Sequence, residues 1–280
     1  MHKPMTELGI VDIREIIRAI KSFYNYDFSN FALTSFKQRL ERLIIRNNLS
    51  NADSLIKKLR DEPDFFDIFL HEISVSSTEM FRDPSLWRWL REDLLPSSVE
   101  KSIGKFKIWL PNCVSGGELF SLMILLSEIN LIDKVSIIAT TLSNKSIEIT
   151  KEGQYDLKKI EVSTENYIRA NGSATFMDYY RLDRYYAFRD TSLIKDVEFI
   201  KLNINFDNAP TNVKFILFRN SLIYYNPTMQ DRILSVLNNC LSASGNLIIG
   251  IKEKITGISS NKDFEIVNEA EGVYKKRIIG

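Results

Sequence analysis

Hydrophobic residues in the first quarter of the chain recur at intervals of three and four positions. This spacing places Ile13, Ile16, Ile17, Ile20 and Phe23 along one side of a helix. The same spacing returns at 33–47, 55–59 and 65–73, and helix-capping residues occupy the turn at 50–53. No strand pattern precedes residue 106. The sequence therefore predicts a small all-helical N-terminal domain.

After residue 96 the pattern changes to short apolar runs that alternate with helical segments. Strands are predicted at 106–110, 135–141, 197–202, 213–218 and 246–251, and helices at 119–130, 145–152 and 228–241. This alternation is typical of a mainly parallel sheet with both faces covered. Apolar runs at 264–267 and 273–278 flank a polar connection and predict a terminal antiparallel hairpin. The predicted class is α/β.

One segment interrupts the alternation. Residues 176–188, FMDYYRLDRYYAF, are rich in aromatic side chains and alternate in polarity, which predicts an inserted antiparallel piece of two or three strands. Such tyrosines are more often packing residues than recognition residues. A small sheet beside a ligand-binding domain would also suit the binding of a partner.

Two polar segments are candidate functional sites. Residues 74–83 join the helical part to the sheet and combine hydroxyl side chains with Met80-Phe81-Arg82-Asp83. This composition fits either a linker or a ligand-facing loop. Pro84 predicts an extended conformation at Asp83. A helix is predicted to follow at 86–94. The turn Gly116-Gly117-Glu118 connects a strand to a helix and would present backbone N–H groups to a ligand. An ordinary strand-to-helix connection is at least as typical, because neither a G-x-G-x-x-G nor a G-x-x-x-x-G-K-[ST] motif is present.

Composition narrows the classes of partner and site. The formal net charge of +1 gives no general attraction for nucleic acid or an anionic membrane. Two distant cysteines and two histidines offer no metal-ligand spacing, so no metal site is predicted. Without a signal peptide or an apolar run of about 18 residues, we expect a cytoplasmic protein that does not insert into a membrane.

The predicted helix at 33–47 carries an excess of basic residues, namely Lys37, Arg39, Arg42 and Arg46. Cations on one helix face are more often a solvated surface than a binding surface. The alternative is docking against an acidic partner helix, which would act mainly on association rate and orientation.

Six segments together resemble the chemotaxis receptor methyltransferases, the CheR family, in order and approximate spacing over nearly the whole chain. They are 73–83 (ISVSSTEMFRD), 108–121 (IWLPNCVSGGELFS), 138–155 (IATTLSNKSIEITKEGQY), 203–204 (NI), 218–225 (FRNSLIYY) and 244–247 (SGNL). The resemblance implies a helical receptor-contacting domain and linker over residues 1–83. It implies a Rossmann-like methyltransferase domain over residues 84–280, with a β insert at about 172–196.

The same resemblance implies the chemistry. The methyl donor would be S-adenosylmethionine and the product S-adenosylhomocysteine. The acceptor would be glutamate side chains on the cytoplasmic helices of a chemoreceptor, whose acidic methylation region would suit the basic side chains of Lys37, Arg39 and Arg42. The insert corresponds to a subdomain that in some members binds a receptor tail, and the family suggests a monomer.

Residue roles are carried over from the matched motifs. Arg82 would orient the acceptor carboxylate, since a guanidinium holds a carboxylate with two hydrogen bonds. Tyr224 would lie beside the transferring methyl group. The residues implied to contact the cofactor are Ser76, Thr78, Arg82, Glu118, Thr141, Asn203, Ile204, Arg219 and Asn220. Methyl transfer to an ionised carboxylate needs alignment rather than a strong base, so the scarcity of histidine is consistent with it.

Five positions depart from the family pattern. Thr141 replaces the acidic residue expected at the ribose, Ser76 replaces an asparagine and Gly117 replaces the first glutamate of a pair. Leu119 replaces a proline, and Asn112 replaces a small residue in the turn. Losing a charge-assisted hydrogen bond typically costs about 1.5–3 kcal/mol. Two alternatives therefore stand beside the active enzyme: a degenerate CheR-like binding domain in signalling, and a methyltransferase acting on a small carboxylate.

Overall fold

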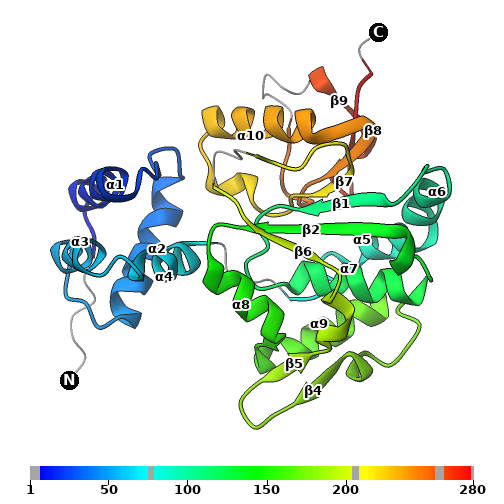
Figure 1. Cartoon of the computed structure of the whole chain (residues 1–280), viewed down its shortest axis with the longest axis horizontal. Coiled ribbons are helices and arrows are strands. Elements are labelled where there is room, and N and C mark those ends of the chain that lie inside the picture. Colours follow the sequence, from blue (N-terminus) through cyan, green and yellow to red (C-terminus); the bar gives the residue numbers. More distant parts are fainter. Residues whose placement is uncertain (1–6, 75–78, 204–207, 256–261, 279–280) are drawn as a thin grey trace.

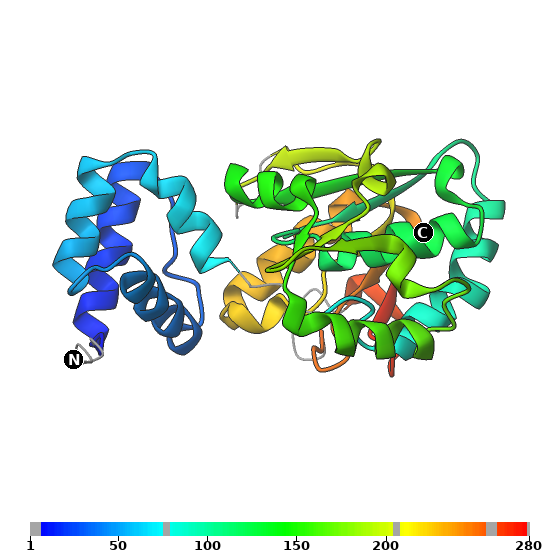
Figure 2. The same ribbon diagram turned by 90° about the horizontal axis from the view of Figure 1, so that it is seen from below.

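The computed structural model describes residues 7–74, 79–203, 208–255 and 262–278. Its N-terminal part contains the helices α1 (Ile10–Tyr24), α2 (Leu33–Arg46), α3 (Ala52–Asp61) and α4 (Phe65–Ile73). They form a bundle beside the sheet (Figures 1 and 2). The prediction of a helical N-terminal region is confirmed, since its apolar stripes, including Ile16, Ile20 and Phe36, are buried.

The rest of the chain is built on a seven-stranded sheet with the order β6-β2-β1-β7-β8-β10-β9. The strands are β1 (Phe106–Leu110), β2 (Val135–Thr141), β6 (Glu198–Lys201), β7 (Val213–Leu217), β8 (Leu241–Ile248), β9 (Phe264–Asn268) and β10 (Val273–Lys276). The first five in spatial order are parallel, and β10 and β9 are antiparallel. The predicted α/β fold with a terminal antiparallel hairpin is confirmed.

Helices cover both faces of this sheet. Ile108 belongs to a core with α7, whereas Trp109 faces a core that contains α10 and the N-terminal bundle. The helices are α5 (Pro84–Trp89), the π-helical turn η1 (Leu90–Leu94), α6 (Leu95–Glu100), α7 (Gly117–Glu128), α8 (Asn144–Glu152), α9 (Ile160–Arg169) and α10 (Pro227–Cys240). Short 3-10 turns are η2 (Ile132–Lys134), η3 (Leu157–Lys159), η4 (Phe176–Tyr179), η5 (Thr191–Ile194) and η6 (Leu222–Tyr224). The helix predicted at 86–94 begins earlier, with Pro84 in its first turn, and α9 was not predicted.

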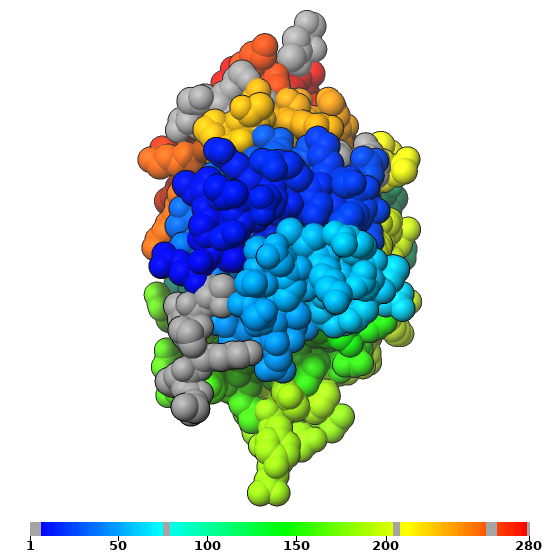
Figure 3. Space-filling model, turned by 90° about the vertical axis from the view of Figure 1, so that its left-hand side faces the viewer, coloured from blue at the N-terminus to red at the C-terminus, as the bar shows by residue number. Residues whose placement is uncertain are grey.

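The aromatic insert is a second, three-stranded antiparallel sheet. Its order is β3-β5-β4, from β3 (Gln154–Tyr155), β4 (Tyr180–Leu182) and β5 (Ala187–Arg189). The antiparallel insert is confirmed, but its third strand, β3, comes from a segment before α9. Figure 3 shows this hairpin, in yellow-green, projecting below the helical bundle.

The helical bundle is fixed to the sheet through α4. The Asp67 carboxylate accepts hydrogen bonds from the backbone N–H groups of Asn144 (3.0 Å) and Lys145 (2.8 Å) and pairs with Lys201 at 2.7 Å. It therefore caps α8, which begins just after the carboxyl end of β2. Of the helices that the structure describes, none has the length and apolar character needed to cross a membrane.

Candidate functional site

Two turns meet at the carboxyl edge of the parallel strands, where open α/β sheets bind their ligands. The turn between β1 and α7 and the turn after β7 line one cavity, to which Glu118, Arg219 and Asn220 contribute. A second cavity lies beside Thr141 and Asn203. Asn112 lines both cavities, so the two form adjoining parts of one site.

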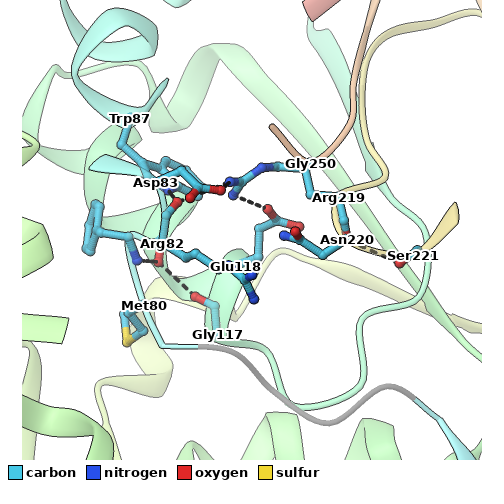
Figure 4. Close-up of polar contacts among 12 residues, drawn as sticks. Met80, Arg82, Asp83, Trp87, Gly117, Glu118, Arg219, Asn220, Ser221 and Gly250 are labelled. Atoms are coloured by element: carbon cyan, nitrogen blue, oxygen red, sulfur yellow. Dashed lines mark hydrogen bonds and ion pairs between the residues drawn. The ribbon is translucent and has the colours of Figure 1, made fainter. Parts of the chain in front are cut away.

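Arg219 is the centre of the first cavity (Figure 4). Its side chain is 2% exposed and pairs with Glu118 at 2.8 Å and with Asp83 at 2.6 Å. It also donates to the backbone carbonyl of Arg82 at 3.1 Å, a group that accepts from the Trp87 indole as well. Arg219 thus ties together the interdomain segment, the glycine turn and the turn after β7, three segments that are far apart in sequence.

The interdomain segment reaches Arg219 through a left-handed backbone. Asp83 has φ 60° and ψ 69°, so the extended conformation predicted from Pro84 is wrong. Phe81 is also left-handed, with φ 52°. Aspartate tolerates this region better than most residues, and its pairing with Arg219 compensates for the strain. Arg82 therefore lies between two constrained residues, as at many ligand-binding sites.

The Arg82 guanidinium is only loosely engaged. Its side chain is 35% exposed, and its Nε lies 3.9 Å from the Glu79 carboxylate. The backbone of Arg82 is held by two hydrogen bonds, yet its charged end remains accessible beside the first cavity. This combination suits a group that binds an incoming carboxylate.

Glu118 lies in the first turn of α7, where the helix dipole favours a negative charge. Burial raises the pKa of the Glu118 carboxyl above its ordinary value, and Arg219 acts in the opposite direction. Gly116, which precedes α7, has φ +73°, and a Cβ there would lie 2.7 Å from Cγ2 of Thr150. The glycine turn is therefore required by both conformation and packing.

The second cavity is lined by neutral groups in the part of the chain that the structure describes. Thr141 is 3% exposed, and its Oγ1 has no hydrogen-bond partner among the described residues. Asn203 lines the same cavity. The expected contacts Ser76, Thr78 and Ile204 lie outside the described residues.

Tyr224 follows the same turn but faces the helical bundle. The Arg39 guanidinium lies 4.1 Å from the centre of the Tyr224 ring and donates to the carbonyl of Ile73. Arg39 is only 6% exposed, so the expectation that it faces a receptor is wrong. Lys37 is paired with Glu7 at 3.1 Å. The basic face of α2 is therefore smaller than its sequence indicated.

The structure brings Arg82, Glu118, Arg219 and Asn220 together, and it adds two carboxylates to which the resemblance assigns no role. Asp83 pairs with Arg219, and Glu253 is buried beneath Asn220. Asp83 lies in the candidate segment 74–83, whereas Glu253 belongs to no motif or spacing pattern. The one sequence signal near Glu253 is its partner Asn220, which lies in the matched segment 218–225.

The polar groups that line the two cavities fit S-adenosylmethionine, the cofactor that the resemblance implies. The Glu118 carboxylate can accept from the ammonium group of its amino-acid end. The buried, partnerless Oγ1 of Thr141 is available to a ribose hydroxyl. The lining of the second cavity, as far as the structure describes it, holds no carboxylate, so the ribose would be bound by neutral groups.

Comparisons with known proteins agree with this assignment. Residues 76–273 match the SAM-binding domain of CheR methyltransferases, and residues 11–74 match their all-alpha domain. The Pseudomonas putida protein Cher3 is 29% identical over 266 residues, covering 95% of this chain and 97% of that protein. A chemotaxis protein methyltransferase of Borreliella burgdorferi is 27% identical and covers 94% of each chain.

Among solved structures, the N-methyltransferase NodS of Bradyrhizobium japonicum is 11% identical with a TM-score of 0.36, covering 69% of this chain and 98% of that one. The two family models together span almost the whole chain, from the first helix to the last strand of the sheet. The chain belongs to the CheR methyltransferase family, and S-adenosylmethionine is its cofactor.

Proposed function

We propose that this protein transfers the methyl group of S-adenosylmethionine to glutamate side-chain carboxylates on the cytoplasmic helices of a chemoreceptor. The observation that carries the proposal is the accessible Arg82 guanidinium, fixed through its backbone beside the cavity that Glu118 and Arg219 line. Relatives that cover most of the chain are named chemotaxis protein methyltransferases, which supports the choice of a receptor as acceptor.

The reaction requires little acid–base catalysis by the protein. The bound cofactor supplies an electrophilic methyl group on a positively charged sulfur. A carboxylate oxygen forms the new C–O bond while the S–C bond breaks, and the negative and positive charges are replaced by a neutral ester and a neutral thioether. No proton moves, so no general base is needed, and alignment supplies the rate enhancement.

Each site residue then has a role in that alignment. Arg82 holds the acceptor carboxylate, and Glu118 accepts from the ammonium group of the cofactor. Asn203 and Thr141 contact its nucleoside part, and Arg219 and Asn220 form the floor of the first cavity. Tyr224, whose ring faces Arg39 of the helical bundle, is assigned a place beside the methyl group by the family motif alone. Helix α2 and the β insert would contact the receptor helices and tail.

A titration of S-adenosylhomocysteine, followed by calorimetry, tests the cofactor part. We expect micromolar binding in the wild type and a loss of at least about tenfold in Glu118→Ala, because a charge-assisted hydrogen bond is removed. Glu165→Ala is the matched control, since Glu165 is an exposed carboxylate on α9. Equal affinity in both variants would contradict the role of Glu118.

Methyl label from the cofactor tests the acceptor. Label should appear on a receptor cytoplasmic fragment as a base-labile ester and should be absent from a fragment whose glutamates are replaced by alanine. Arg82→Ala should abolish labelling while leaving S-adenosylhomocysteine affinity within about tenfold. Label on a small carboxylate instead of the fragment would favour the metabolite alternative.

A non-catalytic signalling domain is the second candidate function. It is favoured by the neutral lining of the second cavity, where Thr141 replaces the expected acidic residue. Absence of S-adenosylhomocysteine binding at millimolar concentration, in a folded protein, would establish this alternative. Restoration of binding by Thr141→Asp would then identify the missing carboxylate as the cause.

A further inference from the structure

Glu253 is a buried carboxylate without a cationic partner. The residue is 6% exposed, and no Lys, Arg or His nitrogen of the described residues lies within 4.0 Å of its oxygens. Burying an ionised group without compensation is strongly unfavourable. The structure must therefore stabilise this charge by other means.

Backbone N–H groups provide that compensation. Oε2 accepts from Asn220 at 2.8 Å and from Gly250 at 2.7 Å, while Oε1 accepts from Ile223 at 3.3 Å. The backbone of Leu222 also donates to the carboxylate. Burial raises the pKa of the Glu253 carboxyl, and these N–H groups act in the opposite direction.

The backbone around the carboxylate has the conformation of an anion-binding nest. Asn220 is left-handed, with φ 53°, and the 3-10 turn η6 follows it, so that successive N–H groups converge on one point. Gly250 closes the other side. A Cβ at Gly250 would lie 3.0 Å from Oε2 of Glu253 and 2.7 Å from Oδ1 of Asn220, which leaves room only for glycine.

The nest lies within the turn that carries the site. Arg219, immediately before it, is held by Asp83 and Glu118, and Asn220 lines the first cavity. Tyr224, immediately after Ile223, is held by the helical bundle, since its carbonyl accepts from Ala32 at 2.8 Å. Glu253 is thus the contact that fixes the turn between its two outer attachments.

We propose that Glu253 is a positioning residue that acts as a built-in anion for the turn at 219–224. Its carboxylate sets the backbone at Asn220, and hence the floor of the cofactor cavity, and it sets the direction in which the chain reaches Tyr224. The part that concerns Tyr224 rests on the proposed function, whereas the part that concerns Asn220 requires only cofactor binding.

Replacement of the carboxylate by a small external anion tests the proposal. In Glu253→Gly the nest is vacated, and S-adenosylhomocysteine affinity should fall about tenfold to a hundredfold, because charge-assisted hydrogen bonds are lost. Sodium formate at a concentration of about 0.1 M should recover most of that affinity. Sodium chloride at equal ionic strength should recover much less, since chloride cannot bridge several N–H groups with two oxygens.

A purely packing role would not respond to formate. Glu269→Gln, at an exposed position in the turn before β10, is the control and should bind as the wild type does with either salt. Formate that acts no better than chloride on a folded Glu253→Gly protein would overturn the proposal. Failure of receptor labelling in the wild type, with S-adenosylhomocysteine binding intact, would overturn the proposed acceptor instead.

The conservative variant keeps the test decisive if Glu253→Gly does not fold. The side chain of Glu253→Gln retains one acceptor oxygen, but its NH₂ group would face backbone donors. We expect a weaker S-adenosylhomocysteine affinity in that variant. It should fall less steeply with acid than the wild-type affinity, because Glu118 still titrates whereas the side chain at position 253 no longer does. Wild-type affinity and an unchanged pH profile in Glu253→Gln would overturn the proposal.

Discussion

Removing the Arg219 guanidinium should destabilise the whole site, since this side chain joins three segments. In Arg219→Met the carboxylates of Asp83 and Glu118, which are 16% and 26% exposed, lose their common cation. Breaking a buried ion pair by removing one partner typically costs about 3–5 kcal/mol. Arg219→Lys keeps the charge, but one ammonium group cannot span both carboxylates and the Arg82 carbonyl. We expect a loss of about 1.5–3 kcal/mol in that variant.

Urea denaturation, followed by circular dichroism, gives the free energy of unfolding. Arg232→Met, on the exposed side of α10, is the matched control and should change the free energy of unfolding by less than about 0.5 kcal/mol. The second variant Arg219→Met/Glu118→Gln should recover part of the loss, because it removes one uncompensated charge.

A nearly unchanged Arg219→Lys variant would contradict this role of Arg219. If Arg219→Lys unfolds within about 0.5 kcal/mol of the wild type and binds S-adenosylhomocysteine equally well, the two-carboxylate geometry has no energetic role.

Three further predictions concern single contacts. The raised pKa of Glu118 means that S-adenosylhomocysteine affinity should fall on acidification at a pH above the ordinary carboxylate range, because only the ionised form pairs with an ammonium group. Calorimetry from pH 8 to 5 should show this fall in the wild type, and a weaker affinity that depends less on pH in Glu118→Gln. Burial alone would raise the pKa of Asp67, but hydrogen bonds from Lys201 and two backbone N–H groups outweigh it and lower that pKa, so its stabilisation is present above the unfolded-state pKa and lost as pH falls through the folded-state pKa. Asp67→Asn should therefore reduce the free energy of unfolding by about 1.5–3 kcal/mol at pH 7 and by little at pH 2, and a constant difference would contradict the clamp. Gly116→Ala should lower the melting temperature more than Gly104→Ala, because both have positive φ but only the first Cβ meets a neighbour; equal shifts would exclude a packing effect.

Burial explains why the first and last residues of some strands could be predicted correctly. Strands β1 and β2 begin and end where the sequence indicated, because each is a short apolar run enclosed on both faces. Helix α9 gave no such signal, since its buried residues are Ser163, Asn166 and Tyr167. The backbone of Met80 donates to Oγ of Ser163, and Nδ2 of Asn166 donates to the carbonyl of Met80. A helix that presents polar groups to a loop has no hydrophobic period to detect.

Site residues that lie in sequence motifs could be predicted. Residues whose contacts form only in the folded chain could not. Glu118 and Arg219 came from matched segments, and the structure pairs them. Asp83 was assigned the wrong conformation because a general rule for residues before proline was outweighed by a specific ion pair. Arg39 was counted as a surface cation, although its spacing of three from Phe36 places it on the buried face of α2. Glu253 could not be found, because a nest is formed only after the chain has folded.

The attachment of the helical bundle to the turn after β7 has a consequence for biosynthesis. Asn226 bonds to Asn30 across 196 residues of sequence, and Phe31 forms a bridge with Tyr225. At typical synthesis rates, a ribosome needs about 10–40 s to make the chain between these partners. The N-terminal helices thus emerge and can fold well before their docking surface exists. During that interval the aromatic ring of Phe31, 7% exposed in the finished protein, has no partner on the sheet side. Chains stalled before residue 225 should therefore present this apolar surface to chaperones, whereas completed chains should not.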